Sequence, residues 1–375
     1  MPELTERAIA EISSMEVGYR DGTVPPAEMR VAAEDNMRLI LAVLSGRPVP
    51  RELADSPAAT GRRRAEQHLP LESLLRSFQV DFRVLWEAFI DEARQSSDST
   101  EALFDAVTEV WRVVDSMSAT VVTSYRAAEV ELSRLDLERR YLSFDRLIDG
   151  PVSAAIAAQA ASVLSLPLDG LFVVMVCDAT DDGHALRVER VMREAGLETR
   201  WRRRGRRLIG IVASDGEKVT LALAAVPVRA GVSPPFRGLG GTASAVAMAD
   251  LALSTLPAGS HEAVRLDDVY PEALLMSGGP LAARLRDDVL GPILALRSVR
   301  RDRLLATLRC YFGGSGSVGE IARAMRCHRN TVIHHLDSIE QLTGRSLRQS
   351  ADVIELGLAV LALDLPLTGE GDTSP

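Results

Sequence analysis

The stretch Gly316–Gly344 reads GSVGEIARAMRCHRNTVIHHLDSIEQLTG and contains the patterns of two short helices separated by a tight break. The first pattern has apolar residues at the spacing i, i+3, i+4 and i+7, which predicts one buried helix face made of Val318, Ile321, Ala322 and Met325. Ser317 stands at the expected N-cap, and Glu320 follows three residues later, which is the spacing of a capping box. The break between the helices is Arg326-Cys327-His328.

The second pattern places Val332, Leu336 and Ile339 on one helix face. Gly344 is suited to end this helix because glycine adopts the left-handed conformation of a C-cap without a steric penalty. Two helices joined by so short a turn form a helix-turn-helix, whose second helix can lie in the major groove of DNA. An ordinary helical hairpin with a polar outer face explains the periodicity equally well.

Polar side chains are expected to point away from the apolar face of the second helix. Arginine at 329 and asparagine at 330 have the right chemistry for base edges, since Arg can pair bidentately with guanine and Asn with adenine. Thr331 and His328 can reach phosphates or cap the helix.

The stretch resembles the C-terminal helix-turn-helix of PucR-family transcriptional regulators. The shared motifs are His328-Arg329-Asn330-Thr331-Val332, Ile339-Glu340-Gln341-Leu342-Thr343-Gly344, the preceding Gly313-Gly314, and the closing helix from Asp352 to Leu363. The resemblance implies that His328, Arg329, Asn330 and Thr331 contact double-stranded DNA. Ser317 and His334 are added as weaker candidates, from their position on the polar side of the two helices.

The chain departs from the family in the run Ile333–Ser338, where the family usually carries basic and aromatic residues. Residues 300–364 contain nine arginines and seven acidic residues, a net charge of about +2. Cationic contacts to phosphate supply most of the non-specific affinity for DNA, so a single domain of this charge is expected to bind weakly. Three interpretations remain open: avidity from dimerisation, charge on the histidines at lower pH, or reduced DNA binding.

The composition of the whole chain limits its class. A length of 375 residues allows two to three domains, and a net charge of −9 argues against a general polyanion binder. The three scattered cysteines show neither zinc-ligand nor redox spacing. The start lacks the pattern of a signal peptide, and no apolar run approaches the roughly 18 residues of a membrane span. We therefore expect a soluble cytoplasmic protein without a membrane partner, cofactor or metal.

Residues 1–149 are expected to be helical throughout, with prolines as punctuation. Broad apolar stripes occur at Leu71, Leu74, Leu75, Phe78, Phe82, Leu85, Trp86 and Phe89, and again at Leu103, Phe104, Val107, Val110, Trp111 and Val114. The Arg-rich and Leu-rich segment 61–75 resembles the N-terminal domain of RsbR-type stressosome proteins. That resemblance implies a globin-like helical bundle that dimerises and senses a signal, and a plain bundle without a ligand remains the alternative.

A single helix is predicted for residues 121–144, because the segment has few helix breakers. Its Ala128, Leu132, Leu135 and Leu142 follow an alternating four-three spacing, interrupted by Arg139. This spacing suits either a short coiled-coil seam of a homodimer or packing against the chain's own bundle. Gly150-Pro151 marks the expected domain boundary.

Residues 150–294 show an α/β rhythm that begins with the continuous apolar strand Leu171–Val176. The turn Gly231-Val232-Ser233, the Ala-rich helix 242–256 and the exit Leu290-Gly291-Pro292 resemble those of the CdaR-type GGDEF-like domain. The resemblance implies that the hairpin that holds the nucleotide and Mg²⁺ in active cyclases corresponds to Trp201–Arg207 here. This stretch carries no carboxylate that could hold Mg²⁺. Asp178, Asp181 and Asp182 supply at most half of a metal site and are interpreted as a solvated loop. The arginines of 200–207 favour either an anion-binding site or, more simply, an exposed hairpin.

We thus predict a multidomain, mainly α protein with a central α/β domain. Residues 1–149 form a helical sensor or dimerisation domain, 150–294 a degenerate GGDEF-like domain, 295–365 a helix-turn-helix, and 366–375 a disordered tail. The expected function is a non-enzymatic transcriptional regulator that binds DNA as a homodimer and responds to a small-molecule or protein effector. Its alternatives are a signalling scaffold with a reduced DNA-binding head and, less favoured, a cyclic-dinucleotide enzyme.

Overall fold

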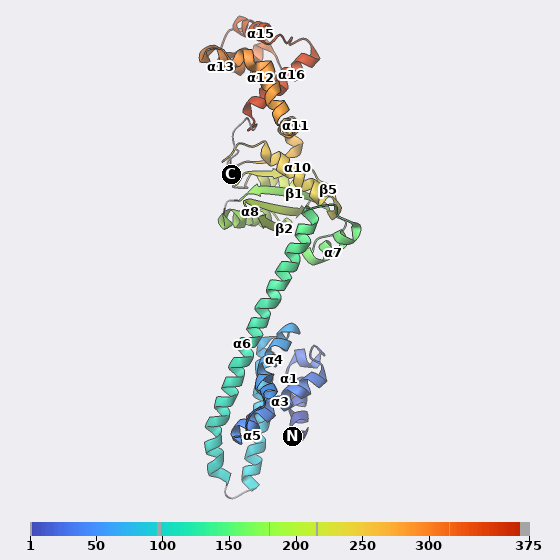
Figure 1. Ribbon diagram of the computed structural model, residues 1–375, viewed down its shortest axis with the longest axis vertical. Coiled ribbons are helices and arrows are strands. Elements are labelled where there is room, and N and C mark those ends of the chain that lie inside the picture. Colours follow the sequence, from blue (N-terminus) through green and yellow to red (C-terminus); the bar gives the residue numbers. More distant parts are fainter. Residues whose placement is uncertain (1, 96–98, 180, 215–216, 315, 368–375) are drawn as a thin grey trace. The chain divides into compact units, whose positions relative to one another are not determined.

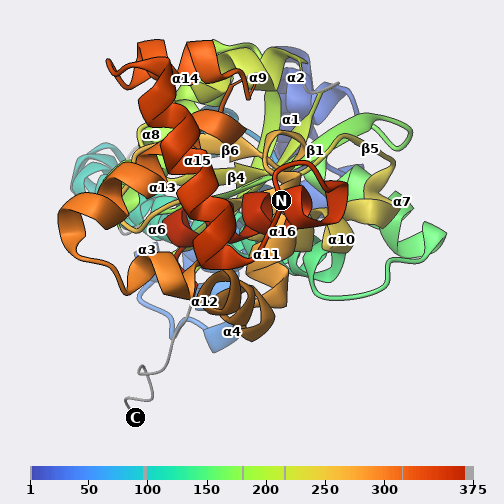
Figure 2. The ribbon, with the colours of Figure 1, turned by 90° about the horizontal axis from the view of Figure 1, so that it is seen from above.

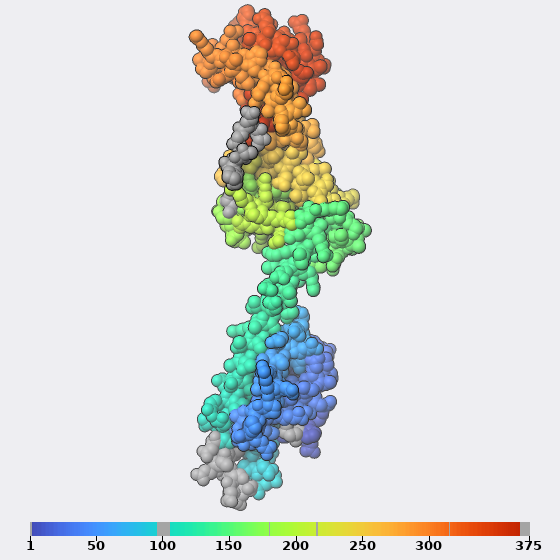
Figure 3. All heavy atoms as spheres, in the orientation of Figure 1, coloured from blue at the N-terminus to red at the C-terminus, as the bar shows by residue number. Residues whose placement is uncertain are grey.

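The computed structural model describes residues 2–95, 99–179, 181–214, 217–314 and 316–367. The chain forms two compact units, Met1–Arg139 and Arg140–Pro375. Figure 1 colours the elements along the chain, and Figure 3 repeats these colours on all heavy atoms.

The first unit is a helical bundle, as predicted. Its described helices are α1 (Pro2–Met15), α2 (Val17–Arg20), α3 (Pro26–Leu44), α4 (Arg51–Glu66), α5 (Leu71–Gln95) and the first part of α6 (Ser99–Ile148). Pro25 and Pro50 occupy the N-caps of α3 and α4. Proline is tolerated there because it has no N–H that the helix must satisfy and its φ suits a helix start. Pro25 and Pro50 therefore mark the starts of helices, as the sequence predicted.

The core of the first unit is built around α5. Its residues Leu74, Phe78 and Leu85 are buried, and Phe82, Trp86 and Phe89 pack against them, which confirms the predicted stripe as core. The stripe predicted farther along is wrong at Trp111, which is 59% exposed. The Trp111 ring lies 5.3 Å from the ring of Phe82, so it covers the edge of the core without filling it. The side chains of Leu103 and Phe104 lie outside the described residues.

Helix α6 is longer than the predicted 121–144, because no proline or glycine interrupts residues 99–148. It ends immediately before Asp149-Gly150-Pro151, while the two compact units divide between Arg139 and Arg140, so the domain boundary expected at 150 stays a prediction. Of the four residues with heptad-like spacing, Ala128 packs against the first core, whereas Leu135 and Leu142 are 49% and 62% exposed.

The second unit begins with a central α/β fold. Its strands are β1 (Leu171–Asp178), β2 (Glu198–Arg204), β3 (Arg207–Ala213), β4 (Ala230–Val232), β5 (Phe236–Arg237) and β6 (Ala263–Arg265). The sheet order is β2-β3-β1-β4-β6, and β5 also pairs with β1. Strand β1 is antiparallel to β3 and β4, while β4 and β6 are parallel.

Strand β1 is buried on both faces, as its continuous apolar run predicted. Phe172, Val174 and Val176 face α7 (Ala154–Leu164) and α10 (Thr242–Ser254). Val173, Met175 and Cys177 face α8 (Asp182–Glu194) and α9 (Glu217–Leu223), and Figure 1 shows α8 and α10 on opposite faces of the sheet. In α9 the buried residues Val219, Ala222 and Leu223 recur at helical spacing.

The C-terminal helices are α11 (Tyr270–Gly278), α12 (Pro280–Leu294), α13 (Ser298–Phe312), α14 (Val318–Ala324), α15 (Arg329–Thr343) and α16 (Ser350–Asp364). Figure 2 looks down onto α13 to α16. One core joins Val289, Leu290 and Ile293 of α12 to Leu304 and Leu308 of α13, to α15 and to α16. The domain boundary expected after residue 294 stays a prediction. Helix α12 precedes this boundary and packs into the core of the helices that follow it, α13 to α16, which are called the head below. No helix of the described residues is long and apolar enough to cross a membrane.

Candidate nucleic-acid interface

The two helices of the predicted helix-turn-helix are α14 and α15, which pack through Ile321, Ala322 and Val332. Ser317 occupies the N-cap of α14 in extended conformation, as predicted. Its side chain accepts no capping bond from the helix, so the Ser317 half of the predicted capping box is not formed. The reason is local: the Glu320 N–H already donates to the Ser317 carbonyl oxygen at 3.0 Å.

The turn between the helices has the hydrogen bonds of a Schellman motif. The Cys327 N–H donates to the Ala322 carbonyl at 3.0 Å, and the Arg326 N–H donates to the Arg323 carbonyl at 3.2 Å. This motif needs a left-handed residue between the helices, and Arg326 fills the position with φ 52°. A side chain in this conformation costs roughly 1–2 kcal/mol, which glycine avoids. The position thus keeps a cation at the expense of backbone strain.

Arg326→Gly is expected to stabilise the helix-turn-helix by roughly 0.5–1 kcal/mol, because it removes most of the left-handed strain. Arg326→Ala is the matched control, since it removes the same charge and keeps Cβ. Hydrogen exchange of the α14 and α15 amides in the full chain measures the difference. Equal protection in the glycine and alanine variants would contradict the assigned strain.

His328 caps the second helix. Its Nδ1 accepts a hydrogen bond from the Asn330 N–H at 3.3 Å, so the capping role considered for this residue is confirmed. The bond requires an unprotonated Nδ1 and satisfies one of the free N–H groups at the helix start. Gly344 ends the helix with φ 65°, also as predicted.

The face of α15 that carries the candidate DNA contacts is open to solvent. Arg329, Asn330, Thr331 and His334 are exposed, while Val332 and Ile339 on the other face are fully buried. His328 precedes this surface, and Ser317 is exposed at the start of α14. Contact of any of these six residues with DNA stays a prediction.

His335 does not supply the positive charge considered for the histidines of this helix. Its Nδ1 lies 2.9 Å from Oγ1 of Thr307 on α13, and the ring is partly buried. Burial, and then the nearby Arg303 and His334, lower the pKa of His335 below its ordinary 6.5. The imidazole is therefore held neutral as part of the head's internal packing.

We expect acidification to loosen the head through His335. The folded pKa is below the unfolded one, so between the two values the unfolded state binds more protons and stability falls as pH falls below about 6.5. Hydrogen exchange of α13 and α15 in the full chain, corrected for intrinsic rates, should lose protection over this range. His335→Gln should remove that dependence; an unchanged pH profile in this variant would show that another group is responsible.

The net charge of residues 300–364 does not show which arginines near the turn are exposed. Arg301, Arg309 and Arg345 pair with Asp302, Asp364 and Glu355. Arg323, Arg326 and Arg329, in contrast, are exposed around the turn of the helix-turn-helix. The local charge beside α15 is therefore more positive than the segment's small net charge indicates, and Arg323 and Arg326 join the candidates for phosphate contact.

Asp178, Asp181 and Asp182 make contacts of their own. Asp178 is the last residue of β1 and is partly buried, so the interpretation as a solvated loop is wrong for it, whereas Asp181 and Asp182 are exposed as expected. Asp178 accepts hydrogen bonds from Arg207 at 3.0 Å and Arg229 at 2.6 Å. Asp181 caps α8, and Asp182 pairs with Arg203. Two guanidinium groups thus neutralise the Asp178 carboxylate. Within the described residues, no three side chains of metal-ligand type cluster together.

The arginines of the β2–β3 hairpin bind the end of α6. Arg202 donates to both oxygens of Asp145 at 3.1 Å, and its guanidinium lies 4.1 Å from the centre of the Tyr141 ring. Arg204 pairs with Asp145 and Asp149. These contacts, named here the α6 clamp, hold Arg202 and Arg204 in ion pairs, so these two arginines form no free anion site. The tip of the hairpin at residues 204–206 is exposed, as the simpler interpretation expected.

Three family models match successive parts of the chain. Residues 2–140 match the RsbT co-antagonist protein rsbRD N-terminal domain, residues 149–255 a GGDEF-like domain, and residues 304–362 the PucR C-terminal helix-turn-helix domain. A solved structure, a regulator of polyketide synthase expression from Bifidobacterium adolescentis, is 19% identical; the match covers 60% of this chain and 97% of that chain, with a TM-score of 0.32. No curated protein matches the chain.

Proposed function

We propose that this chain, which carries an RsbRD N-terminal domain, a GGDEF-like domain and a PucR C-terminal helix-turn-helix domain, is a cytoplasmic transcriptional regulator that reads DNA with α15. The observation that carries the proposal is the exposed Arg329, Asn330 and Thr331 on the first turn of a helix anchored by buried Val332 and Ile339. Those side chains match the donors and acceptors of base edges and phosphates.

A homodimer belongs to this proposal because one head is weakly basic. Two linked heads multiply their affinities when both half-sites lie about 34 Å apart or a multiple of that distance. Leu135 and Leu142, exposed on α6 at coiled-coil spacing, support a seam with a second copy. Leu135→Glu with Leu142→Glu tests the seam by light scattering of the full chain.

Control by the upstream domains is proposed through the α6 clamp. Phe144 and Leu147 of α6 are buried in the core of the central domain, and the clamp fixes the same helix end to β2. A shift of α6 is therefore passed to the central domain and not lost in a loose linker. An effector that prefers one arrangement of α6 would change the spacing of the two heads.

Fluorescence anisotropy with the full chain tests the proposal. DNA from upstream of the chain's own gene is compared with shuffled DNA of the same length, at two salt concentrations. A regulator should prefer the native DNA by about 10³-fold or more and lose affinity with salt. Binding of operator DNA by a monomer, without any detectable dimer, would disprove the proposed spacing mechanism.

A protein-interaction scaffold is the second candidate, favoured by the rsbRD match and by the exposed acidic Asp337 on α15. An acid on this face repels phosphate. Equal and weak affinity for native and shuffled DNA in the same titration would favour the scaffold.

A further inference from the structure

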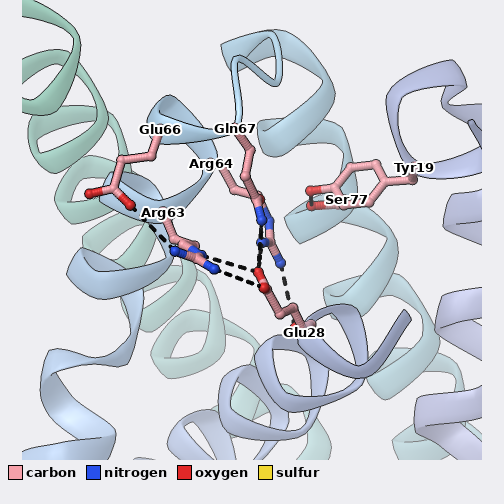
Figure 4. A network of polar contacts seen from close by, with 7 residues as sticks. All are labelled: Tyr19, Glu28, Arg63, Arg64, Glu66, Gln67 and Ser77. Atoms are coloured by element: carbon pink, nitrogen blue, oxygen red, sulfur yellow. Dashed lines mark hydrogen bonds and ion pairs between the residues drawn. The ribbon is translucent and has the colours of Figure 1, made fainter. Parts of the chain in front are cut away.

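A small polar chamber lies inside the first unit, between α3, α4 and α5. It has a volume of about 20 Å³, and its walls include Asn36, Arg64 and Asp81, which are 2%, 2% and 4% exposed. Asn36 donates from Nδ2 to Asp81 Oδ2 at 2.9 Å. The hydroxyls of Tyr19 and Ser77, which also line the chamber, lie 3.1 Å apart (Figure 4).

Three buried polar atoms in this region have no hydrogen-bond partner among the described residues: Asn36 Oδ1, Asp81 Oδ1 and Arg64 Nε. Two of them are acceptors and one is a donor. Buried polar atoms in folded proteins are almost always bonded, because each one left unsatisfied is costly. The set therefore calls for a partner with at least two N–H or O–H donors and one acceptor.

A groove of about 530 Å³ between α3 and α4 adjoins the chamber. The chamber and the groove share Ala32, Thr60 and Arg64 in their walls. The rest of the groove is lined by the apolar Ala27, Val31 and Ala59, and its polar lining is Glu28, Asp35, Glu52, Ser56 and Arg63. A polar head placed in the chamber could thus continue into an apolar chain in the groove.

We propose that this site binds a small aliphatic amine with a neighbouring oxygen, that is, an aliphatic amino acid or amino alcohol. The ammonium group, about the size of a water molecule, donates to Asp81 and Asn36 in the chamber. The ligand oxygen accepts from Arg64 Nε at the shared wall, and the aliphatic chain lies in the groove. This places ligand donors on both orphan acceptors and a ligand acceptor on the orphan donor.

Charge distinguishes this ligand from a single buried water. A water matches the same three atoms in number and size, but it brings no charge for the Asp81 carboxylate and leaves the groove empty. Burial raises the pKa of Asp81 to about 7, and its hydrogen bond from Asn36 only partly opposes that rise. An ammonium partner favours the carboxylate, so ligand binding near pH 7 should release the proton from the protonated fraction of Asp81.

Calorimetric titration of the full chain with L-norvaline, L-norvalinol, n-butylamine and pentanoic acid tests the site. Norvaline or norvalinol should bind, which tells the amino acid from the amino alcohol, and n-butylamine and pentanoic acid should bind at least about tenfold more weakly. The binding heats measured in phosphate and in Tris should differ, because the two buffers take up the released proton with different ionisation enthalpies. No binding of norvaline or norvalinol would reduce the chamber to a water site and overturn the proposal.

Three variants locate the binding. Asp81→Asn should weaken it at least about tenfold and abolish proton release, because a buried charge pair is lost. Ala32→Leu should block passage from the groove without touching the polar atoms. Asp91→Asn, on the exposed end of the same helix, is the matched control and should change affinity less than about twofold. Equal binding by wild type and Asp81→Asn overturns the assignment, and none of these outcomes depends on DNA binding.

Discussion

Replacing Glu28 by alanine is expected to lower the free energy of unfolding of the N-terminal unit by about 3–5 kcal/mol. Glu28 on α3 accepts hydrogen bonds from Arg63, Arg64 and Gln67, and Figure 4 shows these side chains converging on it from α4 and its C-terminal end. The Arg64 side chain is only 3% exposed. Loss of Glu28 leaves this guanidinium buried without its counter-charge, which is the costly way to break a buried pair.

Urea denaturation of the full chain, followed by the fluorescence of Trp86 and Trp111, measures the loss. Glu66→Ala is the matched control, because Glu66 only meets the exposed side of Arg63 at 3.6 Å. Exposed pairs contribute about 0–1 kcal/mol, so this variant should be nearly neutral. Similar effects of the two substitutions would show that burial of Arg64 is not the cause.

The same carboxylate should make the unit sensitive to acid. The hydrogen bond from Arg63, with those from Gln67 and Arg64, lowers the pKa of Glu28 from 4.5 to about 2. The folded pKa is the lower one, so the stabilisation is complete above about pH 4.5 and is lost as pH falls toward 2. In Glu28→Gln the urea midpoint of unfolding should depend less on pH between 4.5 and 2 than in the wild type. An equal dependence on pH in both proteins would mean that another group causes the acid sensitivity.

Features with a local cause were predictable from the sequence. Helix α15, its Gly344 cap and its buried Val332 and Ile339 follow from spacing over a few residues, and the PucR resemblance read from 328–344 is confirmed by the match of 304–362. Strand β1 was predictable for the same reason, from its continuous apolar run. Propensity and periodicity act within one element, and they determined these elements correctly.

Features that join distant residues were not predictable. The α6 clamp links Asp145 to Arg202, 57 residues away, and neither partner's sequence context names the other. The contacts of Asp178 with Arg207 and Arg229, 29 and 51 residues away, are hidden for the same reason. Charge runs specify how many cations are present, while the tertiary fold decides which carboxylate each one meets.

The buried chamber did leave a signal in the sequence. Asp81 falls at helical spacing between Phe78 and Leu85, on the apolar stripe of α5 itself. A carboxylate on a core face is costly unless something binds it, so its position marks a buried polar site. The predicted stripe consisted of its apolar residues alone and therefore left out Asp81.

Replacing Arg329 or Asn330 by alanine is expected to weaken binding to the native operator by about 1–3 kcal/mol each, roughly 5- to 150-fold. The two side chains are exposed on the first turn of α15, where the recognition helix of a helix-turn-helix meets base edges. Neither substitution disturbs the packing of the head, because Val332 and Ile339 carry it and the His328 cap bonds to the backbone of residue 330.

Anisotropy titrations against operators mutated one base pair at a time distinguish reading from mere attraction. A residue that reads a base should, once truncated, relax preference at one position only, whereas loss of a phosphate contact weakens all sequences alike and lowers the salt slope by about one. Gln341→Ala, an exposed amide farther along α15, is the matched control and should leave affinity unchanged. Wild-type preference at every position in both variants would mean that α15 is not the reading helix. The exposed face would then serve a protein partner, and the weak charge of the head would be the expected consequence.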